Sequence, residues 1–130
     1  MDASAVIHLL LGLPGHEVVE QHVFDVTNPA AAPDLINVEV LHTLRRLERQ
    51  RYLDIDRAGD ALGDFALLPI ARYPTLDFLE HAWELRHNFT PYDAVYIALA
   101  DALGTPLVTA DRHLAEAIPD HAAVEVITLP

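Results

Sequence analysis

Four acidic side chains stand at the ends or edges of apolar segments, where an unpartnered charge is costly. Asp93 and Asp111 flank the apolar run "AVYIALADALGTPLVTA". Asp2 comes just before "ASAVIHLLLG", and Glu39 lies within "LINVEVL". No Arg follows Glu39 three or four residues later, so a helical ion pair is not available to it. These four carboxylates are the first candidates for a chemical role.

Carboxylates gathered in one cleft repel one another, which raises some of their pKa values and opposes folding. A divalent cation relieves that repulsion, and a ligand set made only of oxygen favours Mg²⁺ or Mn²⁺ over zinc. Cations held in this way activate water and stabilise the charge that develops during displacement at phosphorus. The four acids together therefore suggest metal-assisted hydrolysis of a phosphodiester.

Each acid also has a purely structural explanation. Thr90 and Asp93 match a capping box, and Asp111 could cap the segment "RHLAEAI". Glu39 could be a solvated acid at a helix edge, and Asp2 an ordinary terminal acid. These alternatives stay open for each residue alone. The set carries more weight, because one cleft of an α/β fold could gather all four.

Hydrophobic spacing and capping residues predict a series of helices that must position these acids. The expected segments are 5–12 with Ser4 as cap and Gly12 as end, 33–50 with Pro33 near its start, 55–68 with Asp56 as cap, 75–88, 90–104 with Thr90 as cap and Gly104 as end, and 111–118. Strands are predicted over 105–110 and 123–129, and segment 69–74 fits a brief strand or a connector. Between the first two of these helices lies a polar stretch, 14–31.

Strands separated by helices indicate an α/β fold with a mainly parallel sheet. Ligands of such sheets bind beyond the carboxyl ends of the strands. Asp111 stands just past the expected strand "PLVTA", so it is predicted to lie at that edge.

The composition excludes several other chemistries. The chain has 130 residues, 52 % of them hydrophobic, which suffices for one domain with a substantial core. It has no cysteine, and all eight basic residues are Arg, which excludes disulfides, thiolate nucleophiles, phosphate loops that need Lys and Schiff bases. His16 and His22 are too far apart for a zinc-binding H-E-x-x-H helix, and Ser4 lacks a recognised activating His.

No apolar run is long enough to span a bilayer and no signal peptide is evident, so a soluble, cytoplasmic protein without a membrane partner is expected.

The four acids lie in segments that resemble the PIN-domain ribonucleases, specifically the VapC-type toxins of bacterial toxin–antitoxin pairs. The matching segments are "DASAVIHLLLG", "APDLINVEVLHTLRRL", "AWELRHNFTPYDAVYIALADALGTPLVTADRHLA" and "VEVITL". They cover most of the chain in the family's order. The motifs D-A-S, N-V-E-V, T-x-Y-D-A-x-Y and T-A-D-R-x-L are specific in combination.

The resemblance implies a single PIN domain over residues 1–130, with a three-layer fold in which helices flank a mainly parallel sheet. It implies catalytic and metal-binding roles, with Mg²⁺ or Mn²⁺, for Asp2, Glu39, Asp93 and Asp111, supported by Ser4 and Thr109. It further implies RNA cleavage that leaves a 5′-phosphate and a 3′-hydroxyl. The implied partners are an RNA substrate and a cognate VapB-type antitoxin, in homodimers and toxin–antitoxin hetero-oligomers.

The first strand is a departure from the family. An apolar strand in the middle of the sheet precedes the first Asp in the family, whereas only Met1 precedes Asp2 here. Either the true start lies upstream, or this strand is truncated or absent. In the second case, Asp2 is expected to be poorly anchored and the sheet to lose central pairing.

The net charge of −12 repels a nucleic-acid backbone, so RNA binding needs cations in the cleft and a local basic surface. Five of the eight Arg lie in one short region: Arg45, Arg46, Arg49, Arg51 and Arg57. The RNA-contact candidates are Arg45, Arg46 and Arg49. The alternative for this cluster is a solvated helix face paired with Glu48, Asp54 and Asp56.

Two rival functions use the same acids. One is a catalytically silent module whose cleft only holds a basic partner, and the other is a DNA-directed nuclease or phosphatase. The presence of all four acids favours a hydrolase over the silent module. Substrate preference under matched metal would separate the RNA and DNA enzymes.

Overall fold

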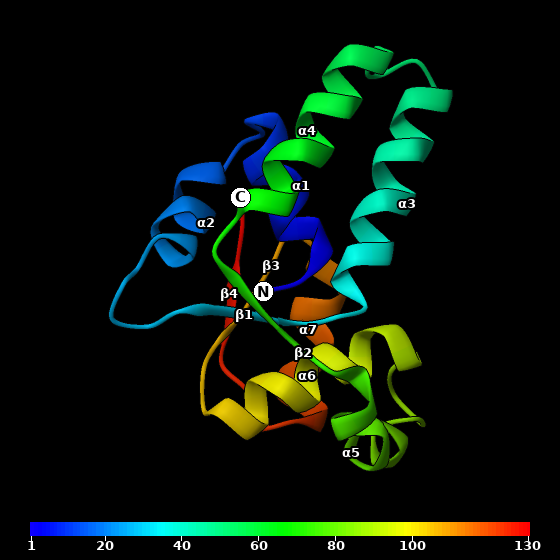
Figure 1. Cartoon of the computed structure of the whole chain (residues 1–130). Coiled ribbons are helices and arrows are strands. Elements are labelled where there is room, and N and C mark those ends of the chain that lie inside the picture. Colours follow the sequence, from blue (N-terminus) through cyan, green and yellow to red (C-terminus); the bar gives the residue numbers. More distant parts are fainter.

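Helices and short strands alternate along the chain (Figure 1). The helices are α1 (Ala3–Leu11), α2 (His16–Val23), α3 (Ile36–Arg49), α4 (Ile55–Leu67), α5 (Leu79–Glu84), α6 (Pro91–Leu103) and α7 (Arg112–His121), with a 3₁₀ turn over Thr75–Phe78. The strands are β1 (Ala30–Pro33), β2 (Ile70–Tyr73), β3 (Leu107–Thr109) and β4 (Val126–Thr128). This computed structural model describes all 130 residues, and it confirms the predicted α/β class. No helix is both long and apolar enough to cross a membrane.

The strands form two separate parallel pairs. β1 pairs with β2, and β3 pairs with β4. The predicted parallel direction is confirmed, but the pairing is divided. Residues Met1 and Asp2 lie in the division: the Met1 amine donates to the Ala31 carbonyl (3.1 Å), and the Asp2 amide donates to the Val108 carbonyl (3.0 Å).

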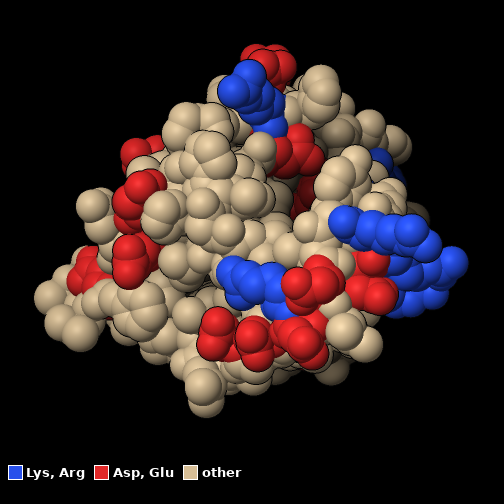
Figure 2. All heavy atoms as spheres, turned by 90° about the horizontal axis from the view of Figure 1, so that it is seen from above, with Lys and Arg blue, Asp and Glu red and all other residues tan.

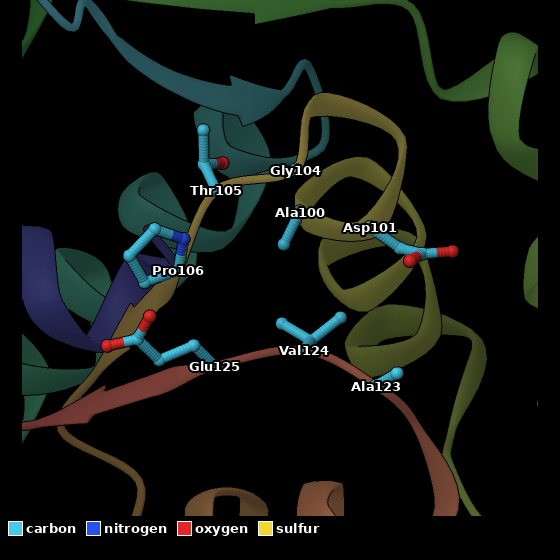
Figure 3. A pocket seen from close by; sticks show the side chains of 8 residues that line it. All are labelled: Ala100, Asp101, Gly104, Thr105, Pro106, Ala123, Val124 and Glu125. Carbon is cyan, nitrogen blue, oxygen red and sulfur yellow. The ribbon is translucent and has the colours of Figure 1, made fainter.

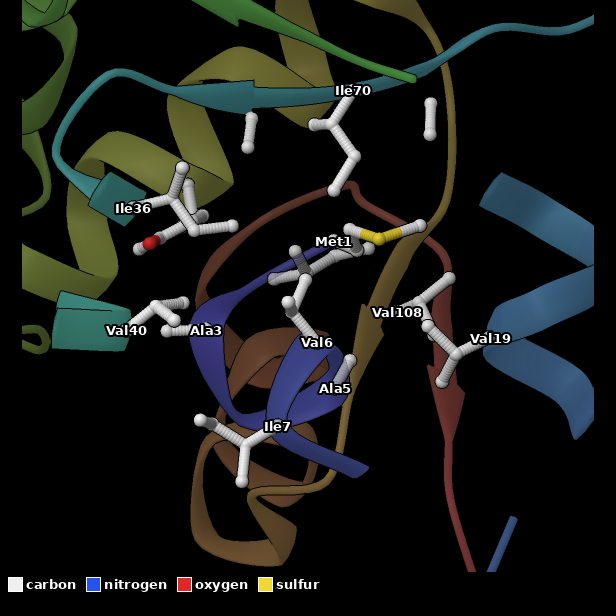
Figure 4. Close-up of a cluster of buried hydrophobic side chains, with 14 of the residues drawn as sticks. Met1, Ala3, Ala5, Val6, Ile7, Val19, Ile36, Val40, Ile70 and Val108 are labelled. Carbon is white, nitrogen blue, oxygen red and sulfur yellow. The ribbon is translucent and has the colours of Figure 1, made fainter. Parts of the chain in front are cut away.

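The core is built around α1, which contacts α2, α3, α4 and β3. Figure 1 shows α1, α3 and α4 on one side of the strands and α5 and α6 on the other. Val6 is fully buried, and Figure 4 shows it close to Met1 and Ile70 at the centre of the apolar cluster. Burying an aliphatic side chain of this size stabilises the fold by about 1.5–3 kcal/mol. The helix that Asp2 caps and that carries Ser4 is thus fixed by the core.

The polar stretch 14–31, to which the sequence pattern assigned no element, contains all of α2 and the start of β1. Val19 and Val23, one helical turn apart, are buried and attach α2 to the core although its other residues are mostly polar. The helix predicted over 33–50 begins at Ile36, because Pro33 belongs to β1.

Two predicted helix caps are wrong by two residues. Asp2, rather than Ser4, caps α1, and Asp54, rather than Asp56, caps α4. A cap needs extended backbone torsions, as these two Asp have, whereas Ser4 and Asp56 are already helical. The predicted cap Thr90 and the predicted helix ends at Gly12 and Gly104 are confirmed.

The helix predicted over 75–88 is broken. The 3₁₀ turn ends at Phe78, whose torsions (φ −116°, ψ 6°) leave the helical range before α5 begins. The Phe78 ring is buried and meets Tyr73 edge to face, with ring centres 6.5 Å apart. Packing of this ring accompanies the break that local spacing did not predict.

Candidate acidic site

Asp2 is the most deeply buried of the four predicted acids, with 6 % of its surface exposed. Its Oδ1 accepts hydrogen bonds from the amide of Ala5 (3.0 Å) and the hydroxyl of Ser4 (2.6 Å). Its Oδ2 accepts a hydrogen bond from the hydroxyl of Thr109. The expected poor anchoring of Asp2 is therefore wrong, because a helix cap and two hydroxyl groups hold its carboxylate.

Ser4 and Thr109, the predicted supporting residues, join α1 to the end of β3. The Ser4 Oγ also accepts from the amide of Ala110 (2.9 Å), and the Thr109 Oγ1 accepts from the amide of Asp111 (2.9 Å). The two hydroxyl oxygens are 3.3 Å apart. Each hydroxyl thus connects Asp2 to the backbone that leads into α7, which fixes Asp2 and Asp111 relative to each other.

Asp111 caps α7, as the structural alternative predicted. Its Oδ1 accepts from the amide of Leu114 (3.1 Å). The residue is exposed, and its Oδ2 accepts no hydrogen bond within the chain. Capping therefore occupies one oxygen of this carboxylate and leaves the other for a ligand.

Asp93 lies half-buried in the first turn of α6. Its amide donates to the Thr90 hydroxyl (3.2 Å), which is one half of the predicted capping box. Burial raises the pKa of Asp93, and the negative charges of Asp111 and Asp2 raise it further. The charges of Asp2 and Asp111 thus act on Asp93 although these residues come from distant parts of the sequence.

Glu39 lies half-buried on α3, with Oε1 fully buried and without a hydrogen-bond partner. Burial raises the pKa of Glu39, and the charges of Asp2 and Asp93 add to the rise. The Tyr96 hydroxyl lies beside this carboxylate and favours its charged form, although the two make no hydrogen bond of regular geometry. Burial and the Glu39 charge together raise the pKa of Tyr96, so its hydroxyl stays protonated.

Sequence reasoning missed Tyr96, although the signal was present. Tyr96 lies three residues after Asp93 on α6, which places both on one helix face. It is 3 % exposed, and a buried tyrosine normally finds a polar partner for its hydroxyl.

The ligand atoms of the four acids suit a divalent cation, but their side chains do not surround a single point. Their ligand atoms are all oxygens, and Glu39 Oε1 is buried without a partner. Burial raises the pKa values of Glu39 and Asp93, and the charges of the other acids add to the rise. No three acidic or histidine side chains form a ligand group around one point as they stand. The site is therefore a neighbourhood of carboxylates whose side chains must converge to hold an ion.

The Arg cluster lies outside this neighbourhood. Arg45, Arg46 and Arg49 are exposed on α3, and Figure 2 shows basic side chains gathered at the edge where α3 lies. The alternative pairing with nearby acids is wrong, because the two ion pairs of the protein both use His. Arg57 instead donates to the Leu10 carbonyl (2.6 Å) and ties α4 to α1.

A pocket of about 210 Å³ lies away from the four acids, where α6 turns into β3 (Figure 3). It contains two other acids, Asp101 and Glu125, which Figure 3 shows pointing away from each other. This pocket therefore offers no second cluster of carboxylates.

Comparison with known proteins adds independent information on the family. Residues 1–118 match the PIN domain. The chain belongs to the PIN-domain family. It is 39 % identical to Ribonuclease VapC1 of Mycobacterium tuberculosis over 120 residues, which cover 90 % of this chain and 88 % of the relative. It is 32 % identical to Ribonuclease VapC12 of the same species over 127 residues, covering 98 % and 97 %.

A solved structure supports the fold of this PIN domain. The crystal structure of PAE2754 from Pyrobaculum aerophilum superposes with a TM-score of 0.66, covering 96 % of this chain and 79 % of that one. The sequences are 23 % identical, so this similarity concerns the fold alone. The predicted resemblance to VapC-type PIN domains is confirmed by the family match and the two mycobacterial relatives.

Proposed function

We propose that this PIN domain is a metal-dependent endoribonuclease toxin that hydrolyses RNA and is inhibited by a VapB-type antitoxin. The observation that carries the proposal is the proximity of Asp2, Glu39, Asp93 and Asp111, which come from four distant segments and lie near enough for their charges to raise the pKa values of Glu39 and Asp93. Relatives named as VapC ribonucleases match nearly the whole chain, which supports RNA as the substrate.

The four carboxylates would hold Mg²⁺ or Mn²⁺. The side chains of Asp2 and Asp111 are already fixed in orientation without the ion. Ser4 and Thr109 orient Asp2 through its two oxygens, and capping of α7 orients Asp111. Glu39 and Asp93 complete the set, and the raised pKa of each drops again when a cation neutralises the repulsion. Bound cations would supply an activated water and charge stabilisation at phosphorus.

The protein's part in hydrolysis is positioning and proton transfer. Water adds to phosphorus and the bond to the 3′-oxygen breaks, which leaves a 5′-phosphate and a 3′-hydroxyl. One of the carboxylates accepts the proton of the attacking water, and the 3′-oxygen takes up a proton as it leaves. Arg45, Arg46 and Arg49 hold phosphates of the strand outside the acidic neighbourhood.

The same acidity explains the proposed inhibition. A basic segment of the antitoxin, presenting an Arg to the carboxylates, would neutralise them and exclude the cation. Homodimerisation fits the exposed apolar side chains of the 3₁₀ turn and α5, among them Leu76 (74 % exposed) and Trp83 (67 %).

Cleavage of cellular RNA tests the proposal. Asp93→Asn keeps the size of the side chain but removes its charge, and Asp101→Asn makes the same change further along α6, where Asp101 faces His81. We expect cleavage by the wild type and Asp101→Asn with Mg²⁺ or Mn²⁺, none in EDTA, and a loss of at least about a hundredfold in Asp93→Asn. Cleavage that persists in EDTA, or equal loss in both variants, would contradict the proposal. Preference for DNA, or a folded but inactive wild type, would favour one of the two rival functions.

A further inference from the structure

Tyr92 is an exposed aromatic side chain at the rim of the acidic site. It is the second residue of α6 and directly precedes Asp93. Successive side chains of a helix diverge by about 100°, so the two residues point in different directions. The Asp93 carboxylate is half-buried, whereas the Tyr92 side chain is 60 % exposed. An aromatic ring thus extends into solvent beside one of the four acids.

The Tyr92 ring is not covered by another ring or by an Arg. The exposed aromatic side chains of the protein are Phe24, Tyr52, Trp83 and Tyr92. Arg86 packs on the Trp83 ring, with its guanidinium carbon 4.6 Å from the ring centre, and Phe24 lines an apolar groove with Leu67. No such partner packs on Tyr92. Its ring is therefore free to take a flat ligand.

Tyr52 is equally exposed but lies far from the acids. It belongs to the connection between α3 and α4, and Figure 1 shows this connection at the tip of the two helices, away from the strands. At 1.5 Å per residue, α3 continues for about 15 Å beyond Glu39 before it ends at Arg49. Tyr52 therefore provides an exposed tyrosine that is outside the site.

A substrate strand needs uncharged contacts close to the four acids. Arg45 and Arg49 lie six and ten residues beyond Glu39, which is about 9–15 Å along α3. Arg112 follows Asp111 but, like the other Arg of the chain, forms no ion pair with an acid. Carboxylates repel phosphates, whereas a base stacks on an aromatic ring through its uncharged face. Affinity beside the acids should therefore come from a base.

We propose that Tyr92 is a base-stacking residue, whose ring holds one unpaired base of the RNA and so places the neighbouring phosphodiester at the acids. A base within a duplex is stacked on both faces, so Tyr92 selects unpaired nucleotides. The ring makes the contact, and Phe can replace Tyr at this position. This inference rests on the proposed ribonuclease function and adds to it a residue that determines specificity without holding the ion.

Two probes of about the same length separate base contacts from backbone contacts. One is an RNA of about ten uridines, and the other is the same ribose–phosphate backbone without bases. Binding is measured by fluorescence anisotropy with Mg²⁺ in an Asp93→Asn background, so that neither probe is cleaved. We expect Tyr92→Ala to weaken binding of the uridine probe about tenfold, which corresponds to about 1.4 kcal/mol, and to leave binding of the abasic probe unchanged.

Two further variants serve as controls. Tyr92→Phe keeps the ring and should bind the uridine probe within about twofold of the parent, and Tyr52→Ala should bind both probes as the parent does. Equal binding of the uridine probe by Tyr92→Ala and the parent would overturn the inference and leave the proposed function standing. An equal loss on the abasic probe would also overturn it, as would a loss that accompanies a change in oligomeric mass. Failure of the parent to bind RNA at all would instead overturn the proposed function, and this inference with it.

Discussion

Glu39 and Asp93 are the two acids whose ionised forms the fold destabilises. Both lose solvent on folding and face the charge of Asp2, so the protein destabilises their ionised forms. Asp2, in contrast, receives hydrogen bonds on both oxygens. The site thus combines one carboxylate whose two oxygens both accept hydrogen bonds with two carboxylates whose ionised forms are destabilised.

The pH dependence of stability should report this cost. Because the folded-state pKa of each acid is raised, the folded protein binds more protons between the ordinary and the raised values, and stability falls as pH rises through that window. A Glu39→Gln, Asp93→Asn double variant has no charge to form at these two positions, so its stability should not fall in this way. In EDTA at pH 7.5 it should be more stable than the wild type by about 0.5–1 kcal/mol, a figure that allows for solvent screening. The difference should shrink toward pH 4 in urea unfolding. An equal or lower stability of the variant at pH 7.5 would argue against a cost of ionising these two carboxylates in the folded protein.

Tyr96 should tune the site through Glu39. Tyr96→Phe keeps the buried ring but removes the hydroxyl beside the carboxylate, so Mn²⁺ affinity should fall about tenfold in a calorimetric titration. Stability should change little, because the hydroxyl makes no regular hydrogen bond in the ion-free protein. Tyr92→Phe, on the same helix but 60 % exposed, is the matched control. Equal Mn²⁺ affinities of the two variants would show that the Tyr96 hydroxyl has no effect on ion binding.

The junction of α1, β3 and α7 is the element that organises the acids. Ser4 and Thr109 each connect the cap of α1 to the backbone before α7, so two carboxylates share one rigid frame. Glu39 and Asp93 reach this frame from α3 and α6.

Thr109→Val should weaken this junction. Thr109 is fully buried, and the change keeps its shape but leaves Asp2 Oδ2 without a donor, at a cost of about 1–3 kcal/mol. Its register partner in β4, Thr128, is exposed and provides the control, for which Thr128→Val should stay within about 0.5 kcal/mol. Urea unfolding of both variants measures this. Similar losses in both would mean that the hydroxyl bond to Asp2 contributes no stability.

Elements were predictable from sequence where local signals were strong. Thr90, Pro91 and Gly104 predicted α6 almost to the residue, since capping and helix termination are local. The pairing of β1 with β2 and the break at Phe78 depend on contacts with distant residues, which local spacing does not contain. The four acids were identified from their positions and the family resemblance. The hydroxyl bonds that hold Asp2 became visible only when α1 and β3 were placed together.

At the scale of the whole molecule, the proposed function requires a protein with a large negative charge to bind RNA, which is also negatively charged. The net charge is −12, and the exposed Arg of α3 form a local basic surface without ion-pair partners. Counterion release by these residues should therefore supply much of the RNA affinity.

The salt dependence of RNA binding tests this surface. In an Asp93→Asn background, which does not cleave, Arg45→Gln with Arg46→Gln should lower the slope of log K against log salt by about 1.4, or about 0.7 for each lost phosphate contact. Arg86→Gln is the control, because Arg86 packs on Trp83 away from α3. Fluorescence anisotropy with a single-stranded RNA would give the slopes. An unchanged slope in the double variant would assign RNA binding to another surface.

The most direct test of a metal-dependent site at the four acids is to locate Mn²⁺ by anomalous diffraction in crystals of the ion-loaded protein. We expect a peak surrounded by carboxylate oxygens of Asp2, Asp93 and Asp111, with Glu39 turned toward it directly or through water. A peak at Asp101 or Glu125 instead, or none among the four acids at saturating Mn²⁺, would contradict a metal-dependent mechanism at this site.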